Sequence, residues 1–159
     1  RKNKLKIQLN FMQKNNYLIS HTSYLIINKQ NRIIQHRKAK NFFSFEKLLR
    51  SCDIGLSTVM IKRSIMSKNI KFASTKTKED FILWLKISKK GIPIYALNLP
   101  LTKWRYLETS LSSSIFQKLK DGYKVYKVYL NFGYLKSLCL LFLLSINFLI
   151  KSYKSKIND

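Results

Sequence analysis

The chain has 159 residues, and its 31 lysine and arginine residues against seven aspartate and glutamate residues give a formal net charge of +24. Hydrophobic residues make up 46% of the sequence, which excludes a disordered basic tail and allows one domain with a core. A surface this positive attracts polyanions of any kind, including nucleic acid, anionic lipid and nucleotide diphosphates. Lysine far outnumbers arginine, which disfavours specific reading of DNA bases because that relies on the bidentate arginine fork.

The apolar spacing and the β-branched runs predict the elements in chain order. The first part of the chain has a helix at 4–16, a strand at 17–28, a basic turn with a short strand near 33–34, and a helix at 44–50. A strand at 57–61, a helical piece at 62–66 and a helix at about 79–89 follow, and then strands at 94–97 and 101–106 on either side of Pro100. The chain ends with a helix at 115–130 and an apolar helix at 138–150. Strands and helices that alternate with short links predict an α/β domain.

The cysteines and histidines carry no recognisable site. Cys52 and Cys139 lack Cys-x-x-Cys spacing, which indicates a reduced, intracellular chain. His21 and His36 share no metal-ligand spacing and are interpreted as ordinary strand or surface residues. The first residue is Arg1 rather than methionine, so we expect a piece of a longer protein.

Two adjacent carboxylates, Glu79 and Asp80, stand at the start of a predicted helix in a chain with few acids. A structural interpretation is available, because Thr77 followed by Asp80 fits the capping box, in which both side chains bind free backbone N–H groups. The helix dipole also favours negative charge there, by about 0.3–1 kcal/mol. A functional interpretation, in which one carboxylate does chemistry, stays open beside it.

The C-terminal segment at 138–150 has eleven apolar residues in thirteen, interrupted by Ser145 and Asn147. As a helix it covers about 20 Å, which is short of the roughly 30 Å hydrocarbon core of a bilayer. We therefore expect it to lie in the membrane interface, with nearby lysines on anionic headgroups. The alternative is a helix packed on the domain or on a partner.

Four stretches stand in a characteristic order: Lys4-Leu5-x-x-Gln8-x-x-Phe11-Met12 with Tyr17 and Thr22-Ser23-Tyr24; Ser57-Thr58-Val59-Met60-Ile61-Lys62-Arg63; Glu79-Asp80-Phe81-x-Leu83-Trp84-Leu85 with Lys90-Gly91; and Leu99-Pro100-Leu101-x-x-Trp104-Arg105 with Ser110-Leu111-Ser112. Together they resemble the C-terminal half of family 2 glycosyltransferases, which have the GT-A fold. The resemblance implies a Rossmann-like mixed sheet. It assigns residues 1–114 to the acceptor-side half of the transferase domain. Residues 115–159 lie beyond the matched stretches, and their apolar and basic composition predicts a helical, basic, membrane-associating tail.

The resemblance also implies an inverting transferase that moves a sugar from a nucleotide-sugar to an acceptor hydroxyl, in surface polysaccharide biosynthesis at the cytoplasmic face of the cell membrane. Asp80 matches the general base of the family. Glu79 is then expected to hold the helix start or bind the acceptor, and Trp84 to support that face or belong to the core. Arg105 is expected to bind the departing diphosphate or to anchor a loop. The expected partners are the nucleotide-sugar, a glycan or lipid-linked acceptor and an anionic membrane surface.

Two features depart from the family pattern. The Asp-x-Asp motif that binds Mg²⁺ or Mn²⁺ does not occur here, so the metal expected in the full-length enzyme has no ligand motif in this chain, which should be inactive alone. Leu107 stands where many members carry a histidine. Two alternatives stay open: a non-catalytic basic module that binds nucleic acid, which the even spread of lysines disfavours, and an inactive transferase-like scaffold.

Overall fold

The computed structural model describes residues 2–107 and 114–157. Its elements in chain order are α1 (Lys4–Lys14), β1 (Ile19–Ile27), β2 (Ile33–Arg37), α2 (Phe45–Arg50), the 3₁₀ turn η1 (Leu56–Thr58), β3 (Val59–Ile61), the 3₁₀ turn η2 (Arg63–Ile65), α3 (Glu79–Lys89), β4 (Tyr95–Arg105), α4 (Ile115–Lys124), the π-helical turn η3 (Val125–Tyr129) and α5 (Tyr134–Ile157). Most of the predicted helices and strands are therefore present, with α5 longer than the expected segment at 138–150. The strand expected at 57–61 is shorter, because its first residues belong to the turn η1. The predicted α/β class is confirmed.

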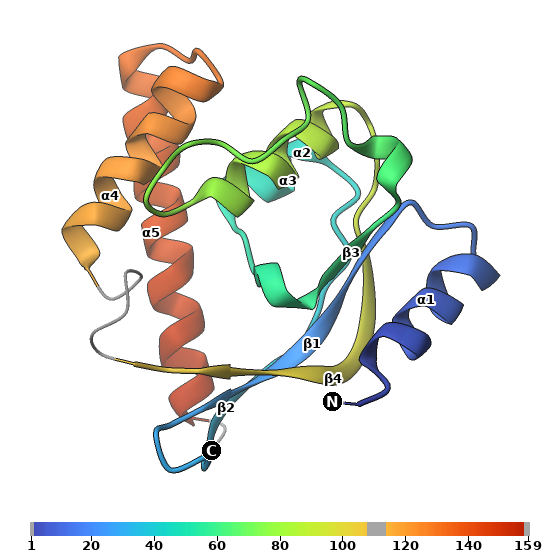
Figure 1. Cartoon of the computed structure of the whole chain (residues 1–159). Coiled ribbons are helices and arrows are strands. Elements are labelled where there is room, and N and C mark those ends of the chain that lie inside the picture. The colour runs from blue at the N-terminus through green and yellow to red at the C-terminus, as the bar shows by residue number, and fades with distance from the viewer. Residues whose placement is uncertain (1, 108–113, 158–159) are drawn as a thin grey trace.

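The sheet is built around β1, which pairs with all three other strands (Figure 1). Its first half pairs antiparallel with β3 and its second half pairs antiparallel with β2, while β4 runs parallel to it from Ser20 to Ile27. One strand edge accepts one neighbour at each residue. It follows that β2 and β3 share one edge of β1 and β4 occupies the other, which makes a mixed sheet as expected.

The two strands predicted on either side of Pro100 are one continuous strand, β4, so that part of the prediction is wrong. Proline has no N–H to donate to a strand pair and is tolerated at bulges. The pairing with β1 shifts register on both sides of Ser23, the residue opposite Pro100. These irregularities let the strand pass through the proline without ending.

The sheet is covered on both faces. Figure 1 shows α1 on one side of β1, with α2 and α3 on the other. All residues of β1 are buried except Tyr24, which is half-buried. In α3 every residue from Phe81 to Leu85 is buried, and these side chains form the centre of the core with Leu48, Ile94 and their neighbours.

Gln8 fixes α1 to the sheet. Its side chain is completely buried, and its Nε2 donates hydrogen bonds to the Ser20 carbonyl, the Ser20 hydroxyl and the Thr58 carbonyl at 3.2, 3.0 and 3.0 Å. Buried hydrogen bonds of this kind are costly to leave unmade. One polar residue of α1 therefore holds the helix, β1 and η1 together.

The C-terminal helices join the same core. Val125, Tyr126, Leu140 and Leu144 belong to the hydrophobic cluster that contains α3. The Tyr126 hydroxyl donates to the carbonyl of Leu49 at 2.6 Å, which ties η3 to the end of α2. The boundary expected at residue 114 therefore does not separate two cores. Among the described residues, no helix combines the length and the apolarity that crossing a membrane requires.

Candidate active site

The capping box expected at the start of α3 is not formed. The residue that precedes the helix is Lys78, whose backbone is left-handed (φ 69°) and whose side chain makes no capping hydrogen bond. The side chain of Thr77 turns away from α3, and its hydroxyl donates to Asp121 Oδ2 at 2.8 Å. The local pattern was misleading because a buried carboxylate from α4 competes for the threonine.

Asp80 occupies the first turn of α3 and is half-buried. Its Oδ1 accepts a hydrogen bond of 2.7 Å from the backbone N–H of Phe81. Burial raises the pKa of Asp80 above its ordinary value, against the lowering effect of the Phe81 N–H, and the charge of Glu79 raises it further while that of Lys78 lowers it. A carboxylate made more basic by partial burial is suited to accept a proton.

Two further groups lie within electrostatic reach of Asp80. They come from β1 and from the loop after α2: Tyr24 and Cys52, which also lie within reach of the charge of Asp53. Burial raises the pKa of Cys52 to about 12, and the charge of Asp80 adds to the effect. Burial likewise raises the pKa of Tyr24, so both groups stay neutral near pH 7. Asp80 and Asp53 therefore face two uncharged polar groups.

Gly55 closes this cluster on the side of η1. A Cβ at this position would lie 3.6 Å from both the Tyr24 ring and the Thr58 methyl group. The Thr58 hydroxyl donates to the Gly55 carbonyl at 2.6 Å, which fixes the loop. These separations are ordinary van der Waals contacts, so the loop packs against the tyrosine ring without requiring a glycine at this position.

Asp121 is the residue that the sequence interpretation missed. It lies on α4, is 1% exposed and accepts three hydrogen bonds at Oδ2: from the Thr77 N–H (2.9 Å), the Thr77 hydroxyl (2.8 Å) and Gln117 Nε2 (2.9 Å). Burial alone raises the pKa of Asp121, but these hydrogen bonds lower it more, and the net pKa lies below the ordinary value. Asp121 thus anchors the chain three residues before Asp80. Its isolation among the lysines of a basic helix was the available signal.

The other predicted site residues on α3 lie in different settings. Glu79 is half-buried beside Asp80 on the first turn. Trp84 is 1% exposed and belongs to the core, so the core role left open by the sequence is the one that the structure supports. Its Nε1 has no hydrogen-bond partner among the described residues.

Arg105, at the end of β4, is exposed and holds the turn between β1 and β2. Its Nη1 donates to the carbonyls of Asn28 and Lys29, both at 3.1 Å, and its Nη2 donates to Asn31 Oδ1 at 2.8 Å. Of its two expected roles, anchoring a loop is the one that these contacts provide. The Ser110-Leu111-Ser112 part of the predicted closing loop lies outside the described residues.

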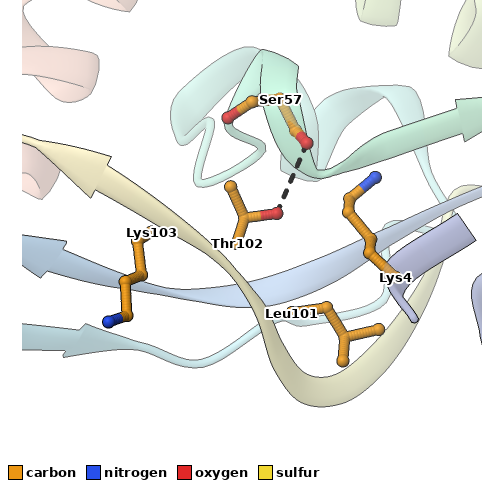
Figure 2. A pocket seen from close by; sticks show the side chains of 5 residues that line it. All are labelled: Lys4, Ser57, Leu101, Thr102 and Lys103. Carbon is orange, nitrogen blue, oxygen red and sulfur yellow. Dashed lines mark hydrogen bonds between the residues drawn. The ribbon is translucent and has the colours of Figure 1, made fainter. Parts of the chain in front are cut away.

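A pocket of about 480 Å³ opens between α1, η1 and β4. It is lined by Lys4, Ser57, Leu101, Thr102 and Lys103, and the Thr102 hydroxyl donates to the Ser57 carbonyl across it at 3.4 Å (Figure 2). The ammonium groups of Lys4 and Lys103 point in different directions in this view, so they do not converge on one anion. None of the predicted site residues lines the pocket.

A bound metal ion requires several acidic, histidine or cysteine side chains grouped together. In the ranges 2–107 and 114–157, no three His, Cys, Asp or Glu side chains are grouped so that they could hold a metal ion. Asp80 and Asp53 supply two acids, and the neutral Cys52 and Tyr24 beside them are poor metal ligands. The residues present thus do not fit a divalent ion.

Comparison with known proteins finds similar sequences that are named as glycosyltransferases. The UDP-Glc:alpha-D-GlcNAc-diphosphoundecaprenol beta-1,3-glucosyltransferases WfgD and WfaP of Escherichia coli are 36% and 33% identical over 77% and 98% of the chain, and the putative teichuronic acid biosynthesis glycosyltransferase TuaG of Bacillus subtilis is 29% identical over 80%. The aligned regions are 48%, 61% and 50% of these relatives, so the chain spans no more than about three fifths of their length. No family model matches the chain. The similarity supports a glycosyltransferase family.

Proposed function

We propose that this chain is the acceptor-side part of an inverting family 2 glycosyltransferase with the GT-A fold, working at the cytoplasmic face of the cell membrane. The observation that carries the proposal is a half-buried carboxylate with a raised pKa, Asp80, in a chain similar to named glycosyltransferases over most of its length. The acceptor class carried over from those relatives is a sugar on a lipid diphosphate. The nucleotide-sugar is then bound by sequence outside these 159 residues.

In the proposed reaction, an acceptor hydroxyl attacks the anomeric carbon of the donor sugar. The bond from that carbon to the nucleoside diphosphate breaks, and its electron pair leaves with the diphosphate. The hydroxyl proton passes to the carboxylate of Asp80. The hydroxyl becomes acidic only as its new bond forms, so a base with a moderately raised pKa is matched to it.

The surroundings of Asp80 serve this role in two ways. The neutral Tyr24 and Cys52 place no extra negative charge near the base. The bonds from Thr77 to Asp121 fix the backbone just before α3, which sets where the carboxylate lies.

The test is transfer by the protein expressed from its native reading frame, with a panel of nucleotide-sugars and a diphosphoundecaprenol-linked sugar as acceptor. Asp80→Asn should lower the transfer rate by about 10²–10⁴-fold, because it removes the base without changing the size of the side chain. Glu79→Gln is the matched control, since it removes the neighbouring charge and should cost less than about tenfold.

Circular dichroism and urea unfolding verify that both variants are folded. Normal transfer by Asp80→Asn would show that another group accepts the proton. If the folded wild-type protein releases no nucleoside diphosphate from any nucleotide-sugar in the panel, the transferase proposal is wrong. The inactive transferase-like scaffold is then the remaining interpretation.

A further inference from the structure

The helix α5 has one face built into the domain. Ser137, Leu140 and Leu144 are buried there, at spacings of three and four residues that place them on one side of a helix. Asn147 continues this side, and its Nδ2 donates to the carbonyl of Arg50 on α2 at 2.9 Å. The side against α4 is close-packed as well, since a Cβ at Gly122 would lie 2.8 Å from Leu141 Cδ1.

The opposite side of α5, here called the outward face, is apolar and exposed. Its central stripe follows the same helical spacing, with Leu135 77%, Leu138 54%, Phe142 65% and Leu149 64% exposed. No charged residue occurs anywhere from Ser137 to Ile150. A helix at a water-exposed surface ordinarily carries polar residues on the side away from the core, and this one does not.

The charge around this face has one sign. Residues 114–150 contain five lysines and a single acid, Asp121, which is buried and hydrogen-bonded. Two of the lysines lie over aromatic rings: Lys136 Nζ is 4.2 Å from the ring of the half-buried Phe132, and Lys127 Nζ is 3.9 Å from the exposed Tyr134 ring. At the start of α4, Ile115 and Phe116 add further exposed apolar surface, at 73% and 82%.

We propose that the outward face of α5 lies in the headgroup and upper acyl region of an anionic lipid bilayer, with the helix parallel to the membrane plane. An apolar stripe on a segment, residues 114–150, that carries five lysines and whose single acid is buried matches such a surface in both polarity and charge. A 24-residue helix is about 36 Å long. In this orientation its length runs along the membrane, and its buried side keeps the domain attached.

Charge decides between this occupant and the other candidates. A second copy of the chain would bring together two bodies of formal charge +24, which repel one another. A nucleic acid complements the lysines but leaves the leucines and Phe142 against phosphate and water. Of these three candidates, only an anionic bilayer complements both the apolar stripe and the lysines. The inference does not depend on whether the chain transfers a sugar.

The test is co-sedimentation of the protein, expressed from its native reading frame, with phosphatidylcholine vesicles containing about one third phosphatidylglycerol. The double variant Leu138→Glu with Phe142→Glu should lower the vesicle partition coefficient at least about tenfold. The matched control is Leu5→Glu with Ile33→Glu, which changes the charge equally at side chains that are 67% and 60% exposed elsewhere on the domain. The added charge alone should lower the partition coefficient of the control about threefold, and the measured loss should agree with this value within about twofold.

The proposal is supported if the wild type binds the vesicles and the outward-face variant loses much more of this binding than the control does. A wild-type protein that stays in the supernatant overturns it, as does equal binding of the two double variants. Equal binding to pure phosphatidylcholine would overturn the role of the lysines. Light scattering without vesicles measures the oligomeric state. If the wild type and the control are dimers and the outward-face variant is a monomer, the outward face binds a second copy of the chain and the bilayer proposal is wrong.

Discussion

The helices α3 and α5 are both rich in apolar residues, but the protein uses them in opposite ways. In α3 the five consecutive residues Phe81–Leu85 are at most 2% exposed, because the helix lies between the sheet and its neighbouring helices. In α5 only one side is covered, and Phe142 and its neighbours stay open. Apolar content alone therefore does not tell whether a helix is central or peripheral. What decides is how many of its sides the fold covers.

The largest expected difference between these helices is in the cost of removing an aromatic ring. Trp84→Ala should lower the free energy of unfolding by about 3–5 kcal/mol, because it empties a fully enclosed site in the core. Phe142→Ala should change it by less than about 0.5 kcal/mol, because that ring is already exposed. Urea unfolding of both variants measures the contrast. A comparable cost for Phe142→Ala would mean that the outward face is covered within the folded protein.

A smaller effect is expected where α4 holds the start of α3. Asp121→Asn should lower the free energy of unfolding by about 1–3 kcal/mol at neutral pH, because three donors share one oxygen that carries charge. The pKa of Asp121 is lowered in the folded state, so its stabilising contribution is complete above the ordinary value near 4 and is lost as the pH falls through the lowered one. Unfolding curves of wild type and variant should therefore converge on acidification. A difference that persists at low pH would assign the effect to packing.

At Asp80 the expected change in stability is smaller than at Asp121, and it has the opposite sign. The pKa of Asp80 is raised in the folded state, so ionisation costs the wild type stability as the pH rises above the ordinary value near 4. Asp80→Asn lacks this cost and should be more stable at neutral pH, by less than about 1 kcal/mol. Unfolding at neutral and acidic pH tests this. A variant that is less stable at neutral pH would indicate a structural carboxylate and weaken the proposed base role.

The sequence predicted the elements whose signals are local. The apolar spacing of α1 and α3, and the glycine after α3, act within a few residues, so those helices were placed nearly at their observed bounds. Pro100 was read as a break because its missing N–H is local, whereas the register shift that accommodates it depends on a partner strand. Thr77 was assigned to the helix that follows it, although its partner Asp121 lies 44 positions away.

Only part of the candidate site can be predicted, because only part of it has a local signal in the sequence. Asp80 and Glu79 stand out by composition, but the approach of Tyr24 and Cys52 to Asp80 depends on how β1 and the loop after α2 pack against α3. The exposed fraction of Trp84 was equally undetermined, because its helix is covered on several sides only in the folded chain. Contacts between distant segments carry no local signature that a single sequence displays.

The parallel pairing of β1 with β4 also affects how the protein is made. Ser20 pairs with Tyr95, which the ribosome adds 75 positions later, and at about 5–20 residues per second that is a delay of roughly 4–15 s. During this time one edge of a strand that is buried in the folded protein has no partner, and such an edge invites aggregation. The growing chain should therefore be most dependent on chaperones between the synthesis of β1 and that of β4, and it should gain protease resistance only after Arg105 has left the exit tunnel.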